Sequence, residues 1–305
     1  MKNKKRILVI GGTGFIGYHL LKQCLKLNWD TTSLSTKKPK NKRRLFKVKY
    51  IICDLSNKNL LIKKLNKNYD YVVNLGGHVD HKNKTKVYKS HFIGCKNLAK
   101  IFINNSITSF IQIGTGLEYG NIRSPQKEVK KNSIKKITSH YAKAKLMATE
   151  YLLKLSKKKN FPVTILRLYQ VYGPKQEINR FLPLIIKACL KNEKFSTTNG
   201  IQYRDFIHVN DVVNAIIKSL KNNKARGKIF NIGSGKPIQI KKIINLVKNL
   251  IKKGNPSYGA IKMRKDENIR LYPSIKNAKI HINWSPKISF NKGLKSTISY
   301  YKNER

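Results

Sequence analysis

The stretch Gly11-Gly12-Thr13-Gly14-Phe15-Ile16-Gly17 decides the fold of this chain. It follows the short apolar run Ile7–Ile10, which is typical of a buried strand, and it precedes apolar residues that recur at helical spacing as far as Leu25. Glycines at such a strand-to-helix turn let the backbone turn tightly and approach a pyrophosphate, and the N–H groups at the helix start attract phosphate. An ordinary glycine-rich turn is the alternative, but the flanking strand and helix favour dinucleotide binding. The cofactor contacts that we expect here are Gly11, Gly14, Phe15, Ile16 and Gly17.

Strands and helices alternate beyond this turn. We expect strands at 31–34, 48–53, 71–75 and 110–113, and helices at 57–66, 84–105, 181–190, 211–220 and 238–251, with short helices over 274–304. The alternation predicts an α/β fold, a Rossmann-like doubly wound parallel sheet whose strand ends share one rim. We assign residues 1–170 to the dinucleotide-binding domain, with some later segments returning to it. Residues 171–305 mainly form a smaller C-terminal α/β substrate lobe.

The composition is that of a folded protein. The chain has 305 residues, 40% of them hydrophobic, which is too many for a disordered chain. No apolar run is long enough to cross a bilayer, and the basic N-terminus lacks a signal-peptide core. Cysteines at 24, 53, 95 and 189 are widely spaced, so we expect neither disulfides nor a metal site, and a reducing cytoplasm.

The formal net charge of +51 would attract nucleic acid and anionic membranes. However, the lysines are scattered along the whole chain, and asparagine and isoleucine are also plentiful. All three residues have A/T-rich codons, so a genomic composition bias accounts for the charge. A nucleic-acid site would be clustered instead. We expect no specific nucleic-acid partner, and only weak, salt-sensitive binding.

The end of the second strand bears on cofactor choice. About 20 residues past the glycines, an acidic residue would bind the ribose 2′-hydroxyl of NAD, but Ser35 stands there, followed by Thr36 and Lys37. Further basic residues follow at Lys38, Lys40, Lys42, Arg43 and Arg44. A hydroxyl with nearby ammonium groups suits a 2′-phosphate, which favours NADP over NAD. Other cofactor contacts are expected from Asp54, which could accept from the adenine amino group, and from Leu55, Leu75, Gly76 and Gly77.

Tyr141 and Lys145 stand four residues apart and therefore share a helix face. A free phenol has a pKa of ~10, and a neighbouring ammonium lowers that pKa toward the working range of an acid/base catalyst. Thr115, which follows the fifth strand, could hold the same substrate oxygen. A surface pair on an amphipathic helix is the alternative, and it would be preferred for these two residues alone. Together with the glycine loop and Thr115, the pair favours catalysis.

These residues and others give the chain a family resemblance. It resembles the extended short-chain dehydrogenase/reductases, specifically the NAD(P)-dependent nucleotide-sugar epimerase/dehydratase/reductase family. The matching motifs span nearly the whole chain. They are the glycine loop, Asp54, Thr115 to Gly120, Tyr141 with Lys145, Leu166-Arg167, Tyr172-Gly173-Pro174, Arg204 to Val209 with Asp211, Asn231 to Gly235, Asn283 to Pro286, and Gly293-Leu294.

The resemblance implies a role for each matching residue. Tyr141 would be the acid/base, Lys145 would bind the nicotinamide ribose and lower the tyrosine pKa, and Thr115 would hydrogen-bond the reacting oxygen. Arg204 resembles the arginine that grips the substrate diphosphate, and Arg264 lies where a second such arginine usually stands. Glu118 and Gln170 complete the expected substrate contacts. A homodimer is also expected.

Some positions depart from the family pattern. Gly116 and Leu117 replace the Asp-Glu pair with which the 4,6-dehydratases of the family remove water from the sugar, so that chemistry is disfavoured. Gln170 stands in place of an asparagine, and so does His91, in the pattern that ends at Gly94. His91 could be a functional substitute, but a helix histidine with satisfied hydrogen bonds is the preferred interpretation.

The expected function is NADP-dependent reduction of a nucleoside-diphosphate 4-keto-6-deoxy sugar, as in polysaccharide biosynthesis, with Tyr141 as the proton donor. An NAD-dependent nucleotide-sugar 4-epimerase is the first alternative, because it would use the same residues. A non-catalytic relative that binds RNA or a membrane is an alternative of another class. The presence of Thr115, Tyr141 and Lys145 argues against it.

Overall fold

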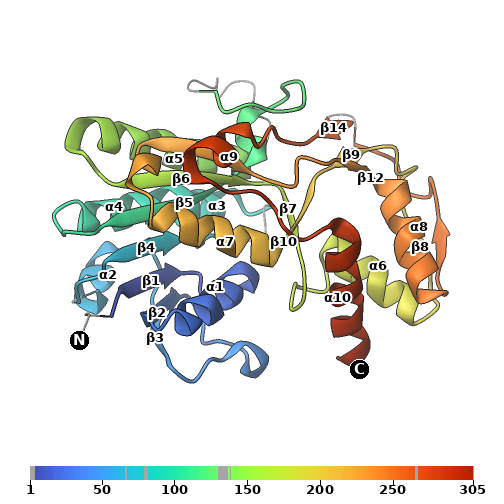
Figure 1. The fold of residues 1–305 in the computed structure, drawn as a ribbon, viewed down its shortest axis with the longest axis horizontal. Coiled ribbons are helices and arrows are strands. Elements are labelled where there is room, and N and C mark those ends of the chain that lie inside the picture. The colour runs from blue at the N-terminus through green and yellow to red at the C-terminus, as the bar shows by residue number, and fades with distance from the viewer. Residues whose placement is uncertain are drawn as a thin grey trace.

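Strand β1 (Arg6–Ile10) lies inside a seven-stranded parallel sheet of order β11-β6-β5-β4-β1-β2-β3 (Figure 1). The computed structural model describes residues 4–65, 67–78, 82–129, 137, 139–264 and 267–304. The other strands of the sheet are β2 (Asp30–Ser35), β3 (Val48–Ile52), β4 (Tyr71–Asn74), β5 (Ser109–Thr115), β6 (Val163–Leu168) and β11 (Lys228–Ile232). The chain runs outward from β1 to β3 and then returns to β4 on the other side of β1. This reversal places a ligand crevice at the carboxyl ends of β1 and β4. The predicted doubly wound fold is confirmed.

The sheet is covered on both faces, because alternate side chains of each strand point to opposite sides. Ile7 and Val9 pack into one hydrophobic cluster, with helices α1, α7 and α9, whereas Leu8 and Ile10 pack into another, with α2, α4 and α5. These helices are α1 (Phe15–Lys26), α2 (Lys58–Lys64), α4 (Gly94–Phe102), α5 (His140–Lys159), α7 (Val209–Leu220) and α9 (Lys276–Ile282). None of the helices among the described residues is both long enough and apolar enough to span a bilayer. The four cysteines are buried and form no disulfide.

A smaller lobe has its own hydrophobic cluster and lies at the right of Figure 1. Its helices are α6 (Phe181–Leu190), α8 (Ile240–Ile251) and α10 (Phe290–Asn303). Its short strands pair as β7 (Gln170–Tyr172) with β10 (Phe206–His208), β8 (Lys194–Ser196) with β13 (Asn255–Ser257), and β9 (Tyr203–Arg204) between β12 (Ile238–Gln239) and β14 (Arg270–Leu271).

Several predicted helix bounds differ from the observed ones. The predicted helix over 84–105 consists of α3 (Lys84–Tyr88), a π-helical turn at Lys89–Ile93, and α4. A π turn takes an extra residue per turn, which the apolar spacing does not reveal. The helix predicted from 238 begins at Ile240, because residues 238–239 pair with β9 as strand β12. Residue 66, the predicted end of the helix over 57–66, lies outside the described residues.

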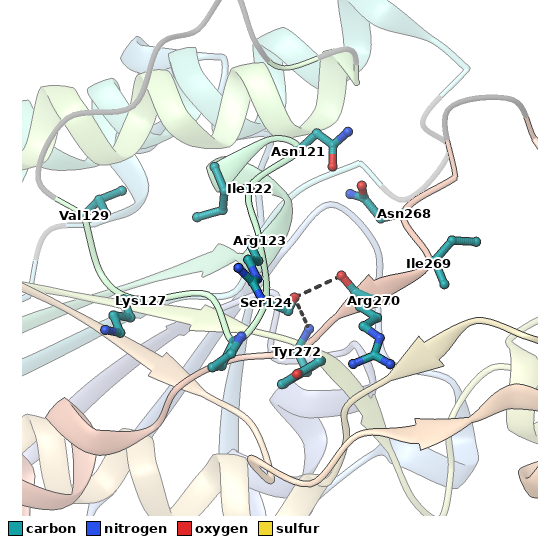
Figure 2. Close-up of a pocket in the computed structure, with 11 residues that line it drawn as sticks. Asn121, Ile122, Arg123, Ser124, Lys127, Val129, Asn268, Ile269, Arg270 and Tyr272 are labelled. Carbon is teal, nitrogen blue, oxygen red and sulfur yellow. Dashed lines mark hydrogen bonds between the residues drawn. The ribbon is translucent and has the colours of Figure 1, made fainter.

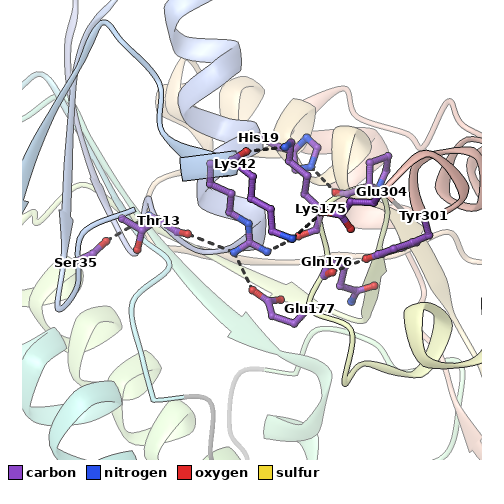
Figure 3. A network of polar contacts seen from close by, with 11 residues as sticks. Thr13, His19, Ser35, Lys42, Lys175, Gln176, Glu177, Tyr301 and Glu304 are labelled. Carbon is purple, nitrogen blue, oxygen red and sulfur yellow. Dashed lines mark hydrogen bonds and ion pairs between the residues drawn. The ribbon is translucent and has the colours of Figure 1, made fainter. Parts of the chain in front are cut away.

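A polar network joins the two lobes near the glycine loop (Figure 3). The Arg43 guanidinium, from the β2–β3 connection, donates to the carbonyl oxygen of Thr13 at 3.3 Å and to Glu177 at 2.9 Å. Next to it, Lys42 pairs with Glu304 at 2.7 Å, near the end of the chain. The loop that follows β2 therefore contacts both the glycine turn and the second lobe.

We predict that Gly17→Ala destabilises the protein more than Gly14→Ala. A Cβ at position 17 would lie 2.3 Å from the carbonyl oxygen of Gly11 and 2.6 Å from the Cα of Gly12, whereas one at position 14 would lie 3.2 Å from its nearest neighbour. Overpacking against backbone typically costs ~1–3 kcal/mol, which exceeds alanine's helix-propensity advantage over glycine. Urea unfolding of both variants measures this, and equal losses would contradict the proposed packing.

Candidate active site

The glycine turn lies at the carboxyl end of β1, where the fold places its ligand crevice. Gly11 has a φ of +76°, and its N–H donates to the carbonyl oxygen of Leu34 at 2.7 Å, so glycine suits this position. Gly14 is the N-cap of α1, and the first turn of α1 carries no acidic residue. The start of α1 can therefore supply N–H groups and positive potential to a pyrophosphate.

Two polar groups from the end of β2 and the connection that follows it contact Thr13 in the glycine turn. Ser35 is buried, and its Oγ accepts from the N–H of Thr13 at 3.4 Å, while Arg43 donates to the carbonyl oxygen of the same residue. Thr36 and Lys37 are exposed just beyond the strand. Among the basic residues of this segment, Arg43 is thus the one in contact with the glycine turn. Sequence reasoning saw it only as one of a run of cations.

The other expected cofactor residues lie after β3 and β4. One carboxylate oxygen of Asp54, Oδ1, accepts from the backbone N–H and the hydroxyl of Ser56, at 2.8 and 2.9 Å. Leu55 is buried, and its side chain lies 3.1 Å from the place of a Cβ on Gly76. The N–H of Leu75 continues the β1–β4 pairing by donating to the carbonyl oxygen of Ile10 at 3.0 Å.

The candidate catalytic groups come from the end of β5 and the start of α5. Thr115 is the last residue of β5, and its Oγ accepts from the N–H of Leu117 at 3.3 Å. Tyr141 and Lys145 lie in the first two turns of α5. The Lys145 ammonium donates to the carbonyl oxygen of Ile113 at 2.7 Å, two residues before Thr115. This contact shows that the first turns of α5 lie against the end of β5.

The pKa values differ from the expectation for this pair. Burial raises the pKa of Tyr141 above its usual range, the Glu118 carboxylate raises it further, and the cation that lowers it is Arg180 rather than Lys145. Burial also lowers the pKa of Lys145, to about 8, against the opposing effects of Glu118 and Cys95. Lys145 is not among the groups that lower the Tyr141 pKa in this geometry, and its effect on the phenol stays a prediction. Tyr141 is a neutral phenol near pH 7, ready to give a proton.

Glu118 does not lie where a substrate contact was expected. Its side chain is 0% exposed and forms an ion pair with Arg167 at 2.8 Å. It also accepts from the N–H of Thr115 at 2.8 Å and from the hydroxyl of Thr149 at 2.9 Å. These contacts enclose the carboxylate. Glu118 therefore positions the Thr115 backbone from inside the protein, which the motif alone did not reveal.

His91 borders the same site. Its buried ring contacts Tyr141 edge to face, with ring centroids 5.1 Å apart. Nε2 lies 3.1 Å from the carbonyl oxygen of His78, and because a carbonyl only accepts, Nε2 carries the proton. Gly77 packs against this ring, since a Cβ there would lie 1.8 Å from its Cε1 atom. His91 is thus a packed histidine with a hydrogen bond, although it also lies beside the candidate acid.

The expected substrate residues Gln170, Arg204 and Arg264 line one cavity of about 470 Å³ in the second lobe. Its apolar lining includes Phe181, Phe195, Phe206 and Ile240. Arg204 is buried, donates to the carbonyl oxygen of Tyr203 at 2.9 Å, and forms an ion pair with Glu267, which sequence reasoning had missed. No sequence motif marked Glu267 as the partner.

A second hollow of about 980 Å³ lies between residues 121–129 and 268–272 (Figure 2). The Ser124 hydroxyl spans these two segments by donating to the carbonyl oxygen of Arg270 at 2.9 Å and accepting from the N–H of Tyr272 at 3.2 Å. No residue expected from the sequence lines this hollow. The smaller cavity is therefore the candidate substrate pocket. Within the described part of the chain, no cluster of three or more histidine, cysteine or acidic side chains could hold a metal ion.

Comparison with known proteins identifies the family. Residues 7–233 match the model of the NAD dependent epimerase/dehydratase family, and the chain belongs to that family. It is 28% identical to human dTDP-D-glucose 4,6-dehydratase over 323 residues, covering 98% of this chain and 90% of that protein. It is 27% identical over 308 residues to a putative UDP-glucose 4-epimerase of Methanocaldococcus jannaschii, covering 97% and 98%. The extended short-chain dehydrogenase/reductase resemblance is confirmed.

Solved structures show the same fold. The chain superposes with a TM-score of 0.86 and 23% identity on UDP-glucuronic acid 4-epimerase from Bacillus cereus, a structure that contains UDP-glucuronic acid and NAD. The alignment covers 98% of this chain and all of that one. At this identity the match concerns the fold, and the assignment of individual residues here depends on the geometry described above.

We predict a pH-dependent stability effect from Lys145. Its folded pKa of about 8 lies below the ordinary value of 10.5, so between these values the unfolded chain binds more protons than the folded one. Stability contributed by this group therefore rises with pH across that window. Relative to Lys145→Met, the unmodified protein should gain about 2 kcal/mol of unfolding free energy between roughly pH 7.5 and 9.5. Urea unfolding of both proteins at the two pH values measures the difference, and a constant difference would contradict the assignment.

Proposed function

We propose that this chain is an NADP-dependent oxidoreductase that reduces the keto group of a nucleoside-diphosphate 4-keto-6-deoxy sugar. The observation that carries the proposal is that burial keeps Tyr141 a neutral phenol on α5, whose Lys145 contacts β5 two residues before Thr115. The acidic residue nearest to Thr115 in the sequence, Glu118, is enclosed by Arg167 and Thr149. Such a site can donate a proton to a reduced carbonyl. It lacks the exposed acid that water elimination would need beside Thr115.

The residues present fit a bound dinucleotide. Gly11 and Gly14 have no side chains that would cover the backbone at the start of α1. Ser35 at the end of β2 and Arg43 in the following connection add a hydroxyl and a cation beside Thr13. When bound, NADPH would supply hydride to the C4 carbon of the sugar. A carboxylate at position 35 would repel a 2′-phosphate, and a serine does not.

The chain's own groups then handle the oxygen at C4. Tyr141 gives its phenolic proton to that oxygen as negative charge develops on it. The Thr115 hydroxyl oxygen already accepts from Leu117, so its proton remains to donate to the same substrate oxygen. Lys145, which the family resemblance assigns to the nicotinamide ribose, keeps its ammonium beside β5.

The second-lobe cavity suits the nucleotide part of the substrate. Its volume of about 470 Å³ lies within the range of ~300–1,000 Å³ common for small-molecule sites. Arg204 and Arg264 bring two guanidinium groups to it, and a guanidinium matches phosphate oxygens with two parallel hydrogen bonds. Glu267, which pairs with Arg204, holds that guanidinium in the cavity wall.

A nucleotide-sugar 4-epimerase that uses NAD is the second candidate. It is favoured by the epimerase names among the relatives and by the NAD in the Bacillus cereus structure. An epimerase first oxidises C4, and that step needs the Tyr141 phenolate as a base. Because burial raises the Tyr141 pKa, the neutral phenol prevails, which supports reduction as the first step.

We predict that Tyr141→Phe lowers the rate of NADPH oxidation with a 4-keto-6-deoxy sugar nucleotide by ~10²–10⁴-fold, the usual contribution of general acid catalysis. Folding and NADPH binding should survive, because only the hydroxyl is removed. Tyr151→Phe, on the same helix, is the matched control and should keep full activity. The assay follows the absorbance of the reduced nicotinamide. An unchanged rate in Tyr141→Phe would refute the mechanism, and C4 epimerisation of a plain sugar nucleotide would favour the second candidate.

We predict that NADPH binds at least several-fold more tightly than NADH, because Ser35 replaces the carboxylate that selects NAD. Ser35→Asp should reverse this order by repelling the 2′-phosphate. Fluorescence titration of both cofactors at one salt concentration measures the ratio, since the net charge of +51 makes any anion's affinity salt-dependent. Equal affinities in the unmodified protein would mean that the end of β2 does not select the cofactor.

A further inference from the structure

The residue after Thr115 has no side chain, and the ring of Tyr169 occupies the space where one would be. A Cβ built on Gly116 would lie 2.7 Å from both Cε1 and Cζ of that ring, and 3.1 Å from its hydroxyl oxygen. Gly116 is buried and Tyr169 is partly exposed. Any larger residue at position 116 would have to displace the ring.

The ring is anchored at its far end. The Tyr169 hydroxyl donates to Oε1 of Gln126 at 2.7 Å, and Gln126 is fully buried. The backbone of Gln126 is itself fixed, because its N–H donates to Tyr272 at 2.9 Å and its carbonyl oxygen accepts from Ser274 at 2.8 Å. Burial raises the pKa of Tyr169, so its hydroxyl keeps the proton that it donates. The ring is therefore held in a fixed position beside Gly116.

Tyr169 also lies between two parts of the proposed site. It contacts the residue next to Thr115 on one side. On the other side its chain neighbour, Gln170, lines the second-lobe cavity together with Arg204. Tyr169 itself does not line that cavity, but a sugar whose C4 oxygen reaches Thr115 and whose diphosphate reaches Arg204 would lie near this ring.

We propose that Tyr169 is a specificity-determining residue that selects sugars with a methyl group, rather than a hydroxymethyl group, at C5. This inference rests on the function proposed above. A methyl group gains apolar contact with the face of the ring, whereas a hydroxyl placed against that face loses water without gaining a hydrogen-bond partner. Because the ring also leaves no room for an acidic side chain at position 116, the same packing excludes acid-assisted loss of a C6 hydroxyl.

Calorimetric titration with ligand pairs tests this role. Uridine, deoxythymidine, cytidine, guanosine and adenosine diphosphates are titrated first, in saturating NADP⁺. Two sugar nucleotides that carry the most tightly bound base are then compared. They are the nucleoside-diphosphate glucose and its 6-deoxy analogue. The unmodified protein should prefer the 6-deoxy sugar by at least about fivefold, below the ~10²-fold that a single hydroxyl commonly contributes in an apolar site.

Three substitutions of Tyr169 distinguish the contribution of its aromatic ring from that of its hydroxyl. Tyr169→Phe keeps the ring and should keep the preference. Tyr169→Ala should reduce the preference to less than about twofold. Tyr169→Gln offers the sugar hydroxyl a hydrogen-bond partner and should abolish or reverse the preference for the 6-deoxy sugar. This variant provides a second measurement if the alanine variant unfolds. The affinity for the nucleoside diphosphate alone should stay unchanged in all three, because we assign the base and phosphates to the second-lobe cavity, which Tyr169 does not line.

The outcomes are distinct. Equal affinity of the unmodified protein for the two sugars would overturn the inference while leaving the proposed function intact. So would a preference that survives in both Tyr169→Ala and Tyr169→Gln. If none of the five nucleoside diphosphates binds the unmodified protein, the proposed function itself fails, and the inference fails with it.

Discussion

One buried carboxylate holds together the elements that carry the candidate catalytic groups. Glu118 bonds to the backbone of Thr115 at the end of β5, to Thr149 on α5, and to Arg167 on β6. A charge removed from water is costly unless hydrogen bonds and an opposite charge compensate for it, and here both do. Such a pair contributes little net stability, but its breakage is expensive. Because any other arrangement would leave this charge without compensation, Glu118 fixes the position of Thr115 relative to Thr149 in the middle of α5.

The cofactor side of the crevice is held by contacts of a different kind. Arg43 reaches from the β2–β3 connection to the Thr13 carbonyl and to Glu177 in the second lobe. Its side chain is only 10% exposed, so water screens this contact less than it screens the surface pairs elsewhere on the chain. The glycine turn and the second lobe thus share one guanidinium. A shift of the second lobe would therefore move a contact of the glycine turn.

Much of the fold could be predicted from local patterns. Ile7–Ile10 and the later apolar runs become strands of one sheet, because a strand buried on both faces is apolar throughout. The spacing of Tyr141 and Lys145 predicts a shared helix face in any context. What could not be predicted depends on contacts between distant residues. Glu118 is enclosed because Arg167, 49 residues later, pairs with it. Similarly, the side chain of Lys145 is oriented by the Ile113 carbonyl, and Arg43 is held by Thr13 and Glu177. The π turn at Lys89–Ile93 leaves no mark in an apolar pattern.

The packing of Tyr169 on Gly116 has a consequence for how such a protein can diverge. An acidic residue at position 116 cannot be accepted while the ring stays in place, and the loss of the ring leaves Gln126 buried without its hydrogen-bond donor. Each change is unfavourable alone, so the two positions are epistatic. A lineage with this pair can therefore gain an acid beside Thr115 only through a destabilised intermediate or a double substitution.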